Sequence, residues 1–536
     1  MTGARHRLLR RVAVRAAAVA GMLGAGTPAA AEARVEGTED VLLVGNNWDG
    51  TADVVDPVTF RRLLRINIVP DLAERRAEIM RDPVGFGLFL GIRLLVGEGH
   101  DQLVDDMFTS IDGRFLYVSR PSLADVVAFD LATKKIVWRV KVEGSRSDHM
   151  AISPDGRRLL VSASTARKVH VIDTAAGRIV GEFESGDQPH ENNFSRDGSL
   201  IYHASIGSVY TPADDPSLDA TKGDRYFQVV DARTLRVLKR IEVGKAMAAA
   251  GYPGMSSAVR PMAISPDERV AYLQLSFLHG FVEFDLQGNR PLRVARLPLS
   301  EKAKRLRREQ YVLDSAHHGL AINPAGTKLC AAGTMSDYAA IVNRSNFAYR
   351  IVPVGDKPYW STNDATGRLC FVSVSGEDRV AVLSYATSEE IASVRVGDHP
   401  QRMRMGPYRS EYLPGDRVAP RLSGLKVVRR KAGRGRALRL RLSEPARLRI
   451  DVRKLRSGRL SRGRCVPLRG RPFARLGCRR YTRVRLVRRR VGAGTRRVAL
   501  GRLRGRGRYR LTVGATDAAG NSATRRLVPF RMRSGR

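Results

Sequence analysis

A short turn, followed by a run of β-branched residues, recurs along this chain and limits its fold more than any other feature. The turn is of the Pro-Asp-Gly kind, and its copies are Ile111-Asp112-Gly113, Pro154-Asp155-Gly156, Arg196-Asp197-Gly198, Pro266-Asp267-Glu268, Pro324-Ala325-Gly326 and Ala365-Thr366-Gly367. The apolar runs are Val126 to Asp130, Val169 to Asp173, Phe227 to Asp231, Phe281 to Asp285, Ala339 to Asn343 and Val380 to Ser384. Short apolar runs bounded by turn residues predict antiparallel strands. Their spacing of about 40 residues indicates a repeat architecture.

The two ends of the repeat region complement each other. A degenerate first copy, Asp53 to Asp56, has no turn before it, whereas His399 to Met405 begins a repeat that nothing completes. We interpret them as parts of one sheet, since closure into a ring leaves only short, protected strand edges. The sequence therefore predicts an all-β fold, with a seven-bladed β-propeller over residues 38–410 and a helical insertion at about 71–102.

Some copies resemble a known family. Ser153 to Val161 and Val171 to Asp173 resemble the YVTN-type (YncE-like) repeats of seven-bladed β-propellers, and the resemblance covers roughly residues 40–407. It implies the fold but no single function, because related propellers include binding proteins, surface-layer proteins and enzymes. The short segment from Gln188 to Gly198 is also similar to the seven-bladed lactonases.

Three insertions interrupt the regular spacing. In the first, residues 73–80 and 84–96 are expected to be helical. We interpret the second of these segments as a buried helix on the propeller rim, with a lid or a lipid-contacting loop as the alternatives. Residues 208–224 predict a surface loop, and residues 299–315 predict a basic helix with a solvated face. Outside the N-terminal segment no stretch has about 20 uncharged apolar residues, so we expect no membrane span in the mature chain.

Residues 1–31 have the features of an export signal peptide. Arginines in residues 5–11 precede an apolar run of small residues from Val12 to Gly26, and Ala29-Ala30-Ala31 offers a cleavage site. The pair Arg10-Arg11 leaves a twin-arginine route open beside the general secretory route, and a basic disordered terminus is the alternative. The sequence thus predicts a secreted or cell-envelope protein.

The C-terminal region differs sharply in charge from the rest. Residues 421–536 hold 39 Lys and Arg but only 3 Asp and Glu, a net charge of +36 out of +40 for the whole chain. Alternation such as Leu438-Arg439-Leu440-Arg441-Leu442 puts leucines on one strand face and arginines on the other. We expect an Arg-rich β-sandwich over residues 420–536. Its segment from Asp517 to Asn521 resembles bacterial Ig-like or fibronectin-like modules.

The four cysteines fall into two pairs. Cys465 and Cys478 are close in sequence, and an exported chain favours a disulfide between them. Cys330 and Cys370 lie one repeat apart in similar contexts, and we expect them to be packed thiols. No Cys-x-x-Cys spacing occurs, which disfavours a cysteine zinc site.

The inner strands of a propeller line its central channel, so equivalent positions in successive repeats should form rings. Aligning each inner strand on the turn that follows it places polar residues on two neighbouring rings. The candidate ligand-binding residues at the channel mouth are Asp105, Asp106, Asp148, His149, His190, Glu191, Arg260, His317, His318, Tyr359, Trp360 and Arg402.

Three interpretations of these rings compete. The charged groups pair with one another and with channel water, or they bind a small anionic or ring-containing ligand through arginine and aromatic side chains. Alternatively, His149, His190 and His318, with the carboxylates, bind a divalent metal ion or act as acid and base. No GxSxG, P-loop or HExxH motif occurs, so no catalytic residue is assigned.

Two functions follow. The first is an exported cell-envelope binding or scaffold protein, in which the channel mouth binds a small molecule or a protein and the basic domain contacts anionic surface polymers. The second is an enzyme at the channel mouth, either a lactonase-like hydrolase or an enzyme that catalyses a metal-assisted reaction. Nucleic acid is a disfavoured partner, because few aromatic residues accompany the arginines of the basic domain.

Overall fold

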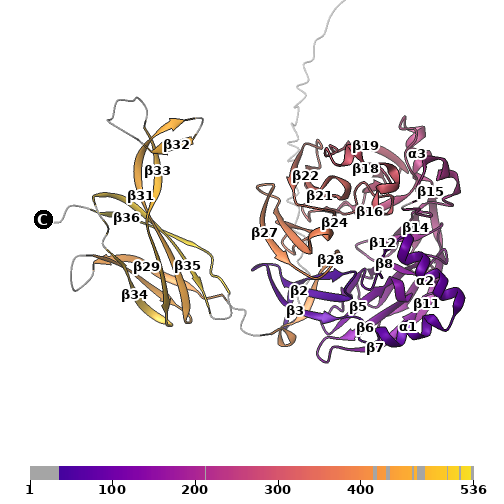
Figure 1. The fold of residues 1–536 in the computed structure, drawn as a ribbon, viewed down its shortest axis with the longest axis horizontal. Helices are drawn as coiled ribbons and strands as arrows, with labels where there is room; N and C mark the ends of the chain where they lie inside the picture. The colour runs from indigo at the N-terminus through magenta and orange to yellow at the C-terminus, as the bar shows by residue number, and fades with distance from the viewer. Residues whose placement is uncertain are drawn as a thin grey trace, which may run out of the picture. The chain divides into compact units, whose positions relative to one another are not determined.

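The computed structural model describes residues 35–211, 213–414, 419–429, 435–461, 464–467, 477–501, 503, 505–517 and 521–532. The expected signal peptide, residues 1–31, lies outside the described residues. Strands dominate the described chain, and most of them form four-stranded antiparallel sheets (Figure 1). No helix in these ranges is long and apolar enough to cross a membrane.

The four-stranded sheets follow one another along the chain. Each group of four strands below is one sheet, given in strand order. The first sheet contains β28 (Pro400–Arg409), β1 (Thr38–Asn46), β2 (Thr51–Asp56) and β3 (Arg61–Asn67). The second contains β4 (Met107–Thr109), β5 (Phe115–Arg120), β6 (Asp125–Asp130) and β7 (Lys135–Lys141), and the third contains β8 (Ser147–Ile152), β9 (Arg158–Ala163), β10 (Lys168–Asp173) and β11 (Arg178–Glu184). The next are β12 (Pro189–Phe194), β13 (Leu200–Ser205), β14 (Phe227–Asp231) and β15 (Val237–Ile241); and β16 (Val259–Ile264), β17 (Val270–Leu275), β18 (Gly280–Asp285) and β19 (Arg290–Arg296). The last are β20 (Leu320–Ile322), β21 (Lys328–Gly333), β22 (Tyr338–Asn343) and β23 (Tyr349–Pro353); and β24 (Pro358–Asn363), β25 (Leu369–Val374), β26 (Arg379–Ser384) and β27 (Glu389–Arg395).

Local hydrogen bonds explain why the turn recurs. Between β8 and β9, the carboxylate of Asp155 accepts from Ser153 Oγ at 2.5 Å and from Arg157 N at 3.1 Å, and Gly156 follows with a φ of +70°. That left-handed conformation favours glycine. The same serine-to-aspartate bond recurs at Ser110–Asp112, Ser195–Asp197 and Ser265–Asp267. Each turn is thus closed by side chains of its own segment.

The sheets are arranged cyclically. Their first strands contact one another in the order β4, β8, β12, β16, β20, β24, β28 and back to β4. Strand β28 pairs with β1, with Val44 opposite Met403 and Val41 opposite Gly406. The pairing of the two ends in one sheet is therefore confirmed. Repeated four-stranded antiparallel sheets give a propeller-like all-β fold.

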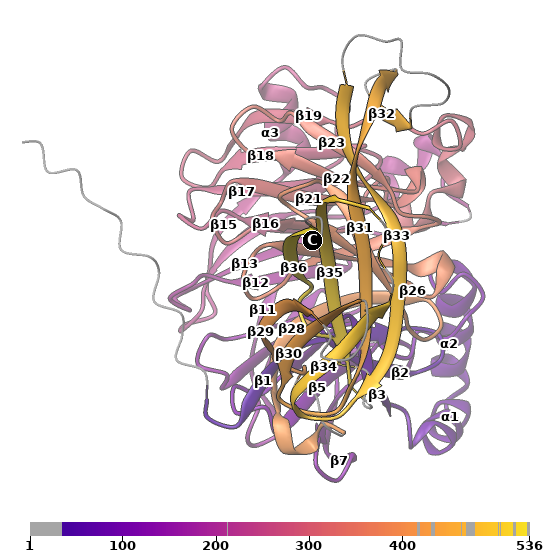
Figure 2. The same ribbon diagram turned by 90° about the vertical axis from the view of Figure 1, so that its left-hand side faces the viewer.

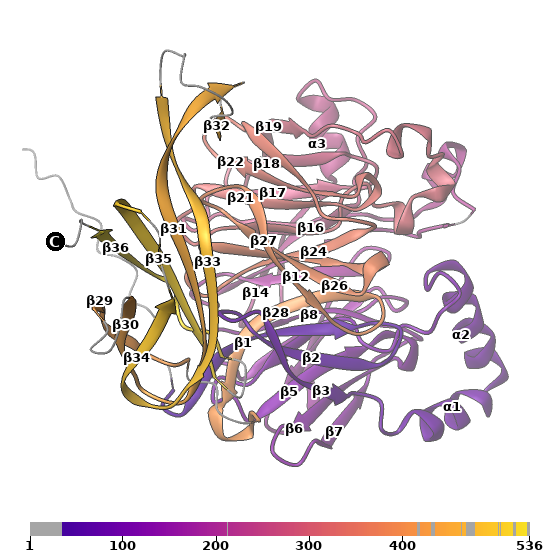
Figure 3. The ribbon, with the colours of Figure 1, turned by 60° about the vertical axis from the view of Figure 1, so that its left-hand side comes forward.

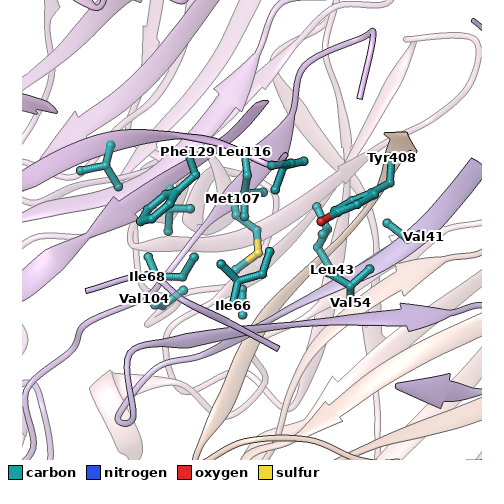
Figure 4. Close-up of a cluster of buried hydrophobic side chains, with 14 of the residues drawn as sticks. Val41, Leu43, Val54, Ile66, Ile68, Val104, Met107, Leu116, Phe129 and Tyr408 are labelled. Atoms are coloured by element: carbon teal, nitrogen blue, oxygen red, sulfur yellow. The ribbon is translucent and has the colours of Figure 1, made fainter. Parts of the chain in front are cut away.

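The apolar core lies between neighbouring sheets. One buried cluster draws residues from sheet β28–β1–β2–β3 and from sheet β4–β5–β6–β7 (Figure 4). In it Leu43 and Val54 of the first sheet face Met107, Leu116 and Phe129 of the second, and all five side chains are fully buried. Each sheet therefore buries its apolar face only with a neighbour.

The first insertion contains α1 (Leu72–Met80) and α2 (Pro83–Leu95), which pack on each other (Figure 3). The expected helices are present, but the expectation of a buried second helix is wrong, since no residue of α2 is buried. Val84 and Leu94 are 73% and 65% exposed. The apolar sequence of α2 alone could not distinguish a buried from an exposed helix.

The third insertion also departs from expectation. Its 3-10 turns are η3 (Ala303–Arg305), η4 (Arg308–Gln310) and η5 (Val312–Asp314), in place of one basic helix. Leu313 and Asp314 both have positive φ, which an α-helix does not allow. Tertiary contacts override helix propensity here: Arg308 lies over Phe277 and pairs with Asp214.

The three insertions meet in one apolar cluster. Val96 after α2, Val209 of the second insertion and Tyr311 of the third pack together. Lys222 of the second insertion pairs with Asp314 at 2.5 Å and is 2% exposed, so this loop is anchored rather than free. The remaining short elements are α3 (Val243–Ala249), η1 (Pro121–Leu123), η2 (Pro216–Thr221), η6 (Thr334–Ser336), η7 (Ser375–Glu377) and η8 (Ser410–Tyr412).

The described part of the C-terminal region forms two sheets (Figure 2). One contains β29 (Leu422–Arg429), β30 (Arg436–Leu442) and β34 (Gly494–Gly501), and the other contains β32 (Arg464–Pro467), β31 (Ala446–Ser461), β35 (Gly507–Thr516) and β36 (Arg526–Met532), with β33 (Gly477–Val491) also paired to β31. Leu438 and Leu440 of β30 share one buried cluster with Leu448 and Ile450 of β31, while Arg439 between the two leucines is exposed. The expected alternation of leucine and arginine is present.

Both cysteine pairs are disulfides. Cys465 is bonded to Cys478, as expected. Cys330 of β21 is bonded to Cys370 of β25, which corrects the expectation of packed thiols. The two residues occupy equivalent strands of neighbouring sheets, and this places their sulfur atoms side by side.

Candidate functional site

The candidate residues come from the first strands of the sheets or from the segments just before them. Asp105 and Asp106 precede β4, Asp148 and His149 lie on β8, His190 and Glu191 on β12, Arg260 on β16, His317 and His318 before β20, Tyr359 and Trp360 on β24, and Arg402 on β28. All are at most 5% exposed. The side chains are therefore enclosed, and they do not line an open mouth.

Three histidines form the centre of the site. One ring nitrogen from each of His149, His190 and His318 lies within 4.8 Å of the other two. The ring centroids of His149 and His190 are 3.7 Å apart, and His318 stacks on Tyr359 at 4.1 Å. Burial lowers the pKa of all three imidazoles well below the ordinary value, and nearby arginines lower it further. At neutral pH the rings are uncharged and can act as ligands.

Carboxylates surround His149. Its Nδ1–H donates to Glu191 Oε2 at 3.0 Å, and its Nε2 lies 3.4 Å from Asp148 Oδ1 and 3.7 Å from Asp105 Oδ2. Burial raises the pKa of Asp105 to about 8, against the opposing effect of Arg402. Burial also raises the pKa of Glu191. A group of carboxyls with raised pKa beside neutral histidines is typical of a functional site.

Arg402 and Arg404 neutralise part of this charge. Arg404 donates two hydrogen bonds to Asp106, at 2.8 and 2.7 Å. Arg402 lies over the Trp360 ring at 3.9 Å, its Nη2 is 3.2 Å from Glu191 Oε2, and the same nitrogen contacts both ring nitrogens of His149. Burial alone would raise the pKa of Asp106. The charges of Arg404 and Arg402 outweigh that effect, so the pKa lies below its ordinary value.

Arg260 is the least satisfied charged group of the site. It is fully buried, and Nε donates to Ser276 Oγ at 3.1 Å. Neither terminal nitrogen, Nη1 or Nη2, has a hydrogen-bond partner among the described residues. Burial lowers the pKa of Arg260, although Asp314 partly opposes this. Its free guanidinium edge is therefore suited to an anion.

One predicted residue lies apart from the cluster. His317 Nε2 is 3.3 Å from Tyr338 Oη, and its ring packs edge-on against His279. Neighbouring residues in extended chain point to opposite sides, so His317 and His318 face different surroundings.

The sequence analysis missed Arg404 and Arg146. Arg146 lies 3.8 Å from Asp148 Oδ2. Arg404 lies two residues beyond Arg402 on β28, and the period of a strand puts both on one face. That periodicity was the signal that could have found it.

No protein-family model matches the sequence, and no curated protein matches it significantly. Among solved structures, hydrazine synthase from Kuenenia stuttgartiensis is similar, at 18% sequence identity and a TM-score of 0.44. The likeness covers 55% of this chain and 88% of that one. We draw no conclusion on fold or function from it.

Proposed function

We propose that this protein is an exported, YVTN-like seven-bladed β-propeller of the cell envelope that binds a small anionic ligand at its centre. The cyclic contacts of the first strands and the pairing of β1 with β28 support the blade count. An Ig-like sandwich follows the propeller in this proposal, supported by the two sheets that share one apolar cluster.

The unpaired guanidinium edge of Arg260 carries the ligand proposal. An isolated buried charge costs on the order of several kcal/mol unless a partner compensates it. Among the described residues neither Nη atom has a hydrogen-bond partner, and the side chain is fully buried. A carboxylate, sulfate or phosphate group would accept two parallel hydrogen bonds from them.

Calorimetric titration of the metal-free protein with acetate, citrate, sulfate and inorganic phosphate tests this proposal. At least one of these anions should bind, and Arg260→Met should weaken that binding by about 10- to 100-fold, as expected for a charge-assisted bidentate contact. Arg293→Met is the matched control, because Arg293 Nε already pairs with Glu283 Oε2 at a distance of 2.5 Å. Equal affinities of the Arg260 variant and the wild type would overturn the proposal.

A second function rests on the basic C-terminal region. On the paired strands β31 and β33, Arg447 lies opposite Arg490 and Arg449 lies opposite Arg488, and all four are exposed. Like charges directly opposite on a sheet are destabilising, so a polyanion laid along this face would relieve their repulsion. We propose that this face contacts anionic polymers of the cell surface.

Binding to isolated cell walls over a salt gradient tests this second function. Replacing Arg447, Arg449, Arg488 and Arg490 by Gln should lower the salt concentration at which the protein is released, because fewer charges are then screened. The control variant carries Gln at four exposed arginines of the other region, Arg157, Arg178, Arg233 and Arg236. Equal release of both variants would argue against a specific basic face.

A further inference from the structure

The centre of the first strands holds a constellation with the geometry of a metal site. We propose that His149, His190 and His318 bind one divalent first-row transition-metal ion. His149 lies on β8, His190 on β12 and His318 just before β20, and one ring nitrogen of each lies within 4.8 Å of the others. Zinc bonds imidazole nitrogens at about 2.0–2.1 Å, so nitrogens on one ion lie at most about 4.2 Å apart, and small rotations of the three rings bring them to that spacing.

The histidines lack the partners that buried imidazoles normally have. Among the described residues, neither ring nitrogen of His318 has a hydrogen-bond partner, and Nδ1 of His190 also has none. His318 is fully buried and His190 is 3% exposed. Buried polar nitrogens are rarely left unsatisfied. A metal ion would supply the missing interaction for two rings at once.

The surroundings of His149 match those of a metal ligand. Glu191 accepts the hydrogen of Nδ1, which leaves Nε2 unprotonated, with its lone pair as the donor toward a metal ion. A carboxylate behind the imidazole is the usual way to fix the tautomer of a ligating histidine. Arg402 Nη2 contacts both Nδ1 and Nε2 of this ring, so metal binding requires the guanidinium to move off Nε2, toward Glu191 Oε2, which lies 3.2 Å from it.

The donor atoms select the class of ion. Three imidazoles favour zinc, copper, nickel or cobalt, whereas calcium and magnesium require oxygen ligands. The carboxylate Oδ2 of Asp105, 3.7 Å from His149 Nε2, is buried and has no partner of its own among the described residues. It can complete the coordination or hold a water molecule at a fourth position.

A second acid-histidine group provides an internal comparison. Glu143, His170 and Glu182 also place ligand atoms within 4.8 Å of one another. Lys168 already pairs with both glutamates, at 3.1 and 2.9 Å, and both are exposed. A cation is therefore present at that group, and we expect no metal there.

The test uses the full-length chain, which is first freed of metal with a chelator and then titrated with Co(II). In a second measurement, the protein competes with a chromophoric chelator for zinc. One Co(II) per chain should bind and give visible d–d absorption typical of low coordination. His190→Ala and His318→Ala should each weaken binding by more than about 100-fold, since losing a ligand costs more than losing a supporting carboxylate. His170→Asn, a buried histidine of the comparison group, should bind Co(II) as the wild type does.

Circular dichroism and thermal unfolding identify variants that fail to fold, and His318→Gln then replaces the alanine variant. Wild-type protein that binds no Co(II), or folded His190 and His318 variants that bind it with wild-type affinity, would overturn the inference. Because the anion titrations use metal-free protein, the failure of one proposal is distinguishable from the failure of the other.

Discussion

Glu191 Oε2 accepts a hydrogen bond from His149 Nδ1 at 3.0 Å, across two neighbouring sheets. If His149 is a metal ligand, this carboxylate fixes its tautomer and increases its basicity. Glu191→Gln should then weaken Co(II) binding by about 10- to 100-fold while leaving one site per chain. Glu182→Gln, in the comparison group on β11, is the control. An unchanged affinity of the Glu191 variant would show that the bond has no part in metal binding.

The disulfide between Cys330 and Cys370 should contribute strongly to stability. It closes a segment with a sequence separation of 40 residues, and a loop of that length corresponds to about 4 kcal/mol of unfolded-state entropy. The double variant Cys330→Ala, Cys370→Ala should lower the free energy of unfolding by roughly that amount, measured by urea denaturation under oxidising conditions. Removing Cys465 and Cys478 instead should leave the same transition in place, because those residues belong to β32 and β33.

Acid should destabilise the fold through His203. Burial lowers the pKa of this histidine to about 3, with Nδ1–H donating to Asn192 and Nε2 accepting from Ser185. In the unfolded chain the pKa is about 6.5, so the unfolded state gains a proton as the pH falls below that value and stability is lost. Between pH 7 and pH 5 the wild type should lose about 2 kcal/mol more than His203→Gln does. Identical losses would contradict the assignment.

Gly319 should tolerate no side chain. A Cβ there would lie 2.8 Å from both Trp360 Cα and Tyr359 O, directly beside His318. Gly319→Ala should therefore destabilise the protein by about 1–3 kcal/mol and weaken Co(II) binding. Gly87→Ala, in α2 with no atom within 4 Å of the added carbon, should be neutral or slightly stabilising. Thermal unfolding of the two variants decides this prediction.

The turns made the sheets predictable because their chemistry is local. Asp155 bonds to residues two positions away on either side, so a short window of sequence carries the whole signal. Alignment on those turns then assigned His190 and His318 to equivalent positions on one ring and His149 to the neighbouring ring. Their convergence follows from the cyclic arrangement of the first strands, which a repeat in the sequence implies.

Other features depended on contacts between distant segments. Cys330 and Cys370 are joined because β21 and β25 occupy equivalent places in neighbouring sheets, and a one-repeat separation was the only trace of this in the sequence. The exposure of α2 and the broken form of residues 303–314 are set by what packs against them. Composition and periodicity carry no information about such neighbours.

The pairing of β1 with β28 has a consequence for how the protein is made. Gly397 N donates to Asn46 Oδ1 at 3.0 Å, across 351 residues of chain. A ribosome releases the segment around Asn46 long before it has translated Gly397, so the nascent chain leaves one edge of its first sheet open throughout the synthesis of the others. Closure is a late, long-range event, so the open edge of the first sheet stays unpaired until the last repeat has left the ribosome.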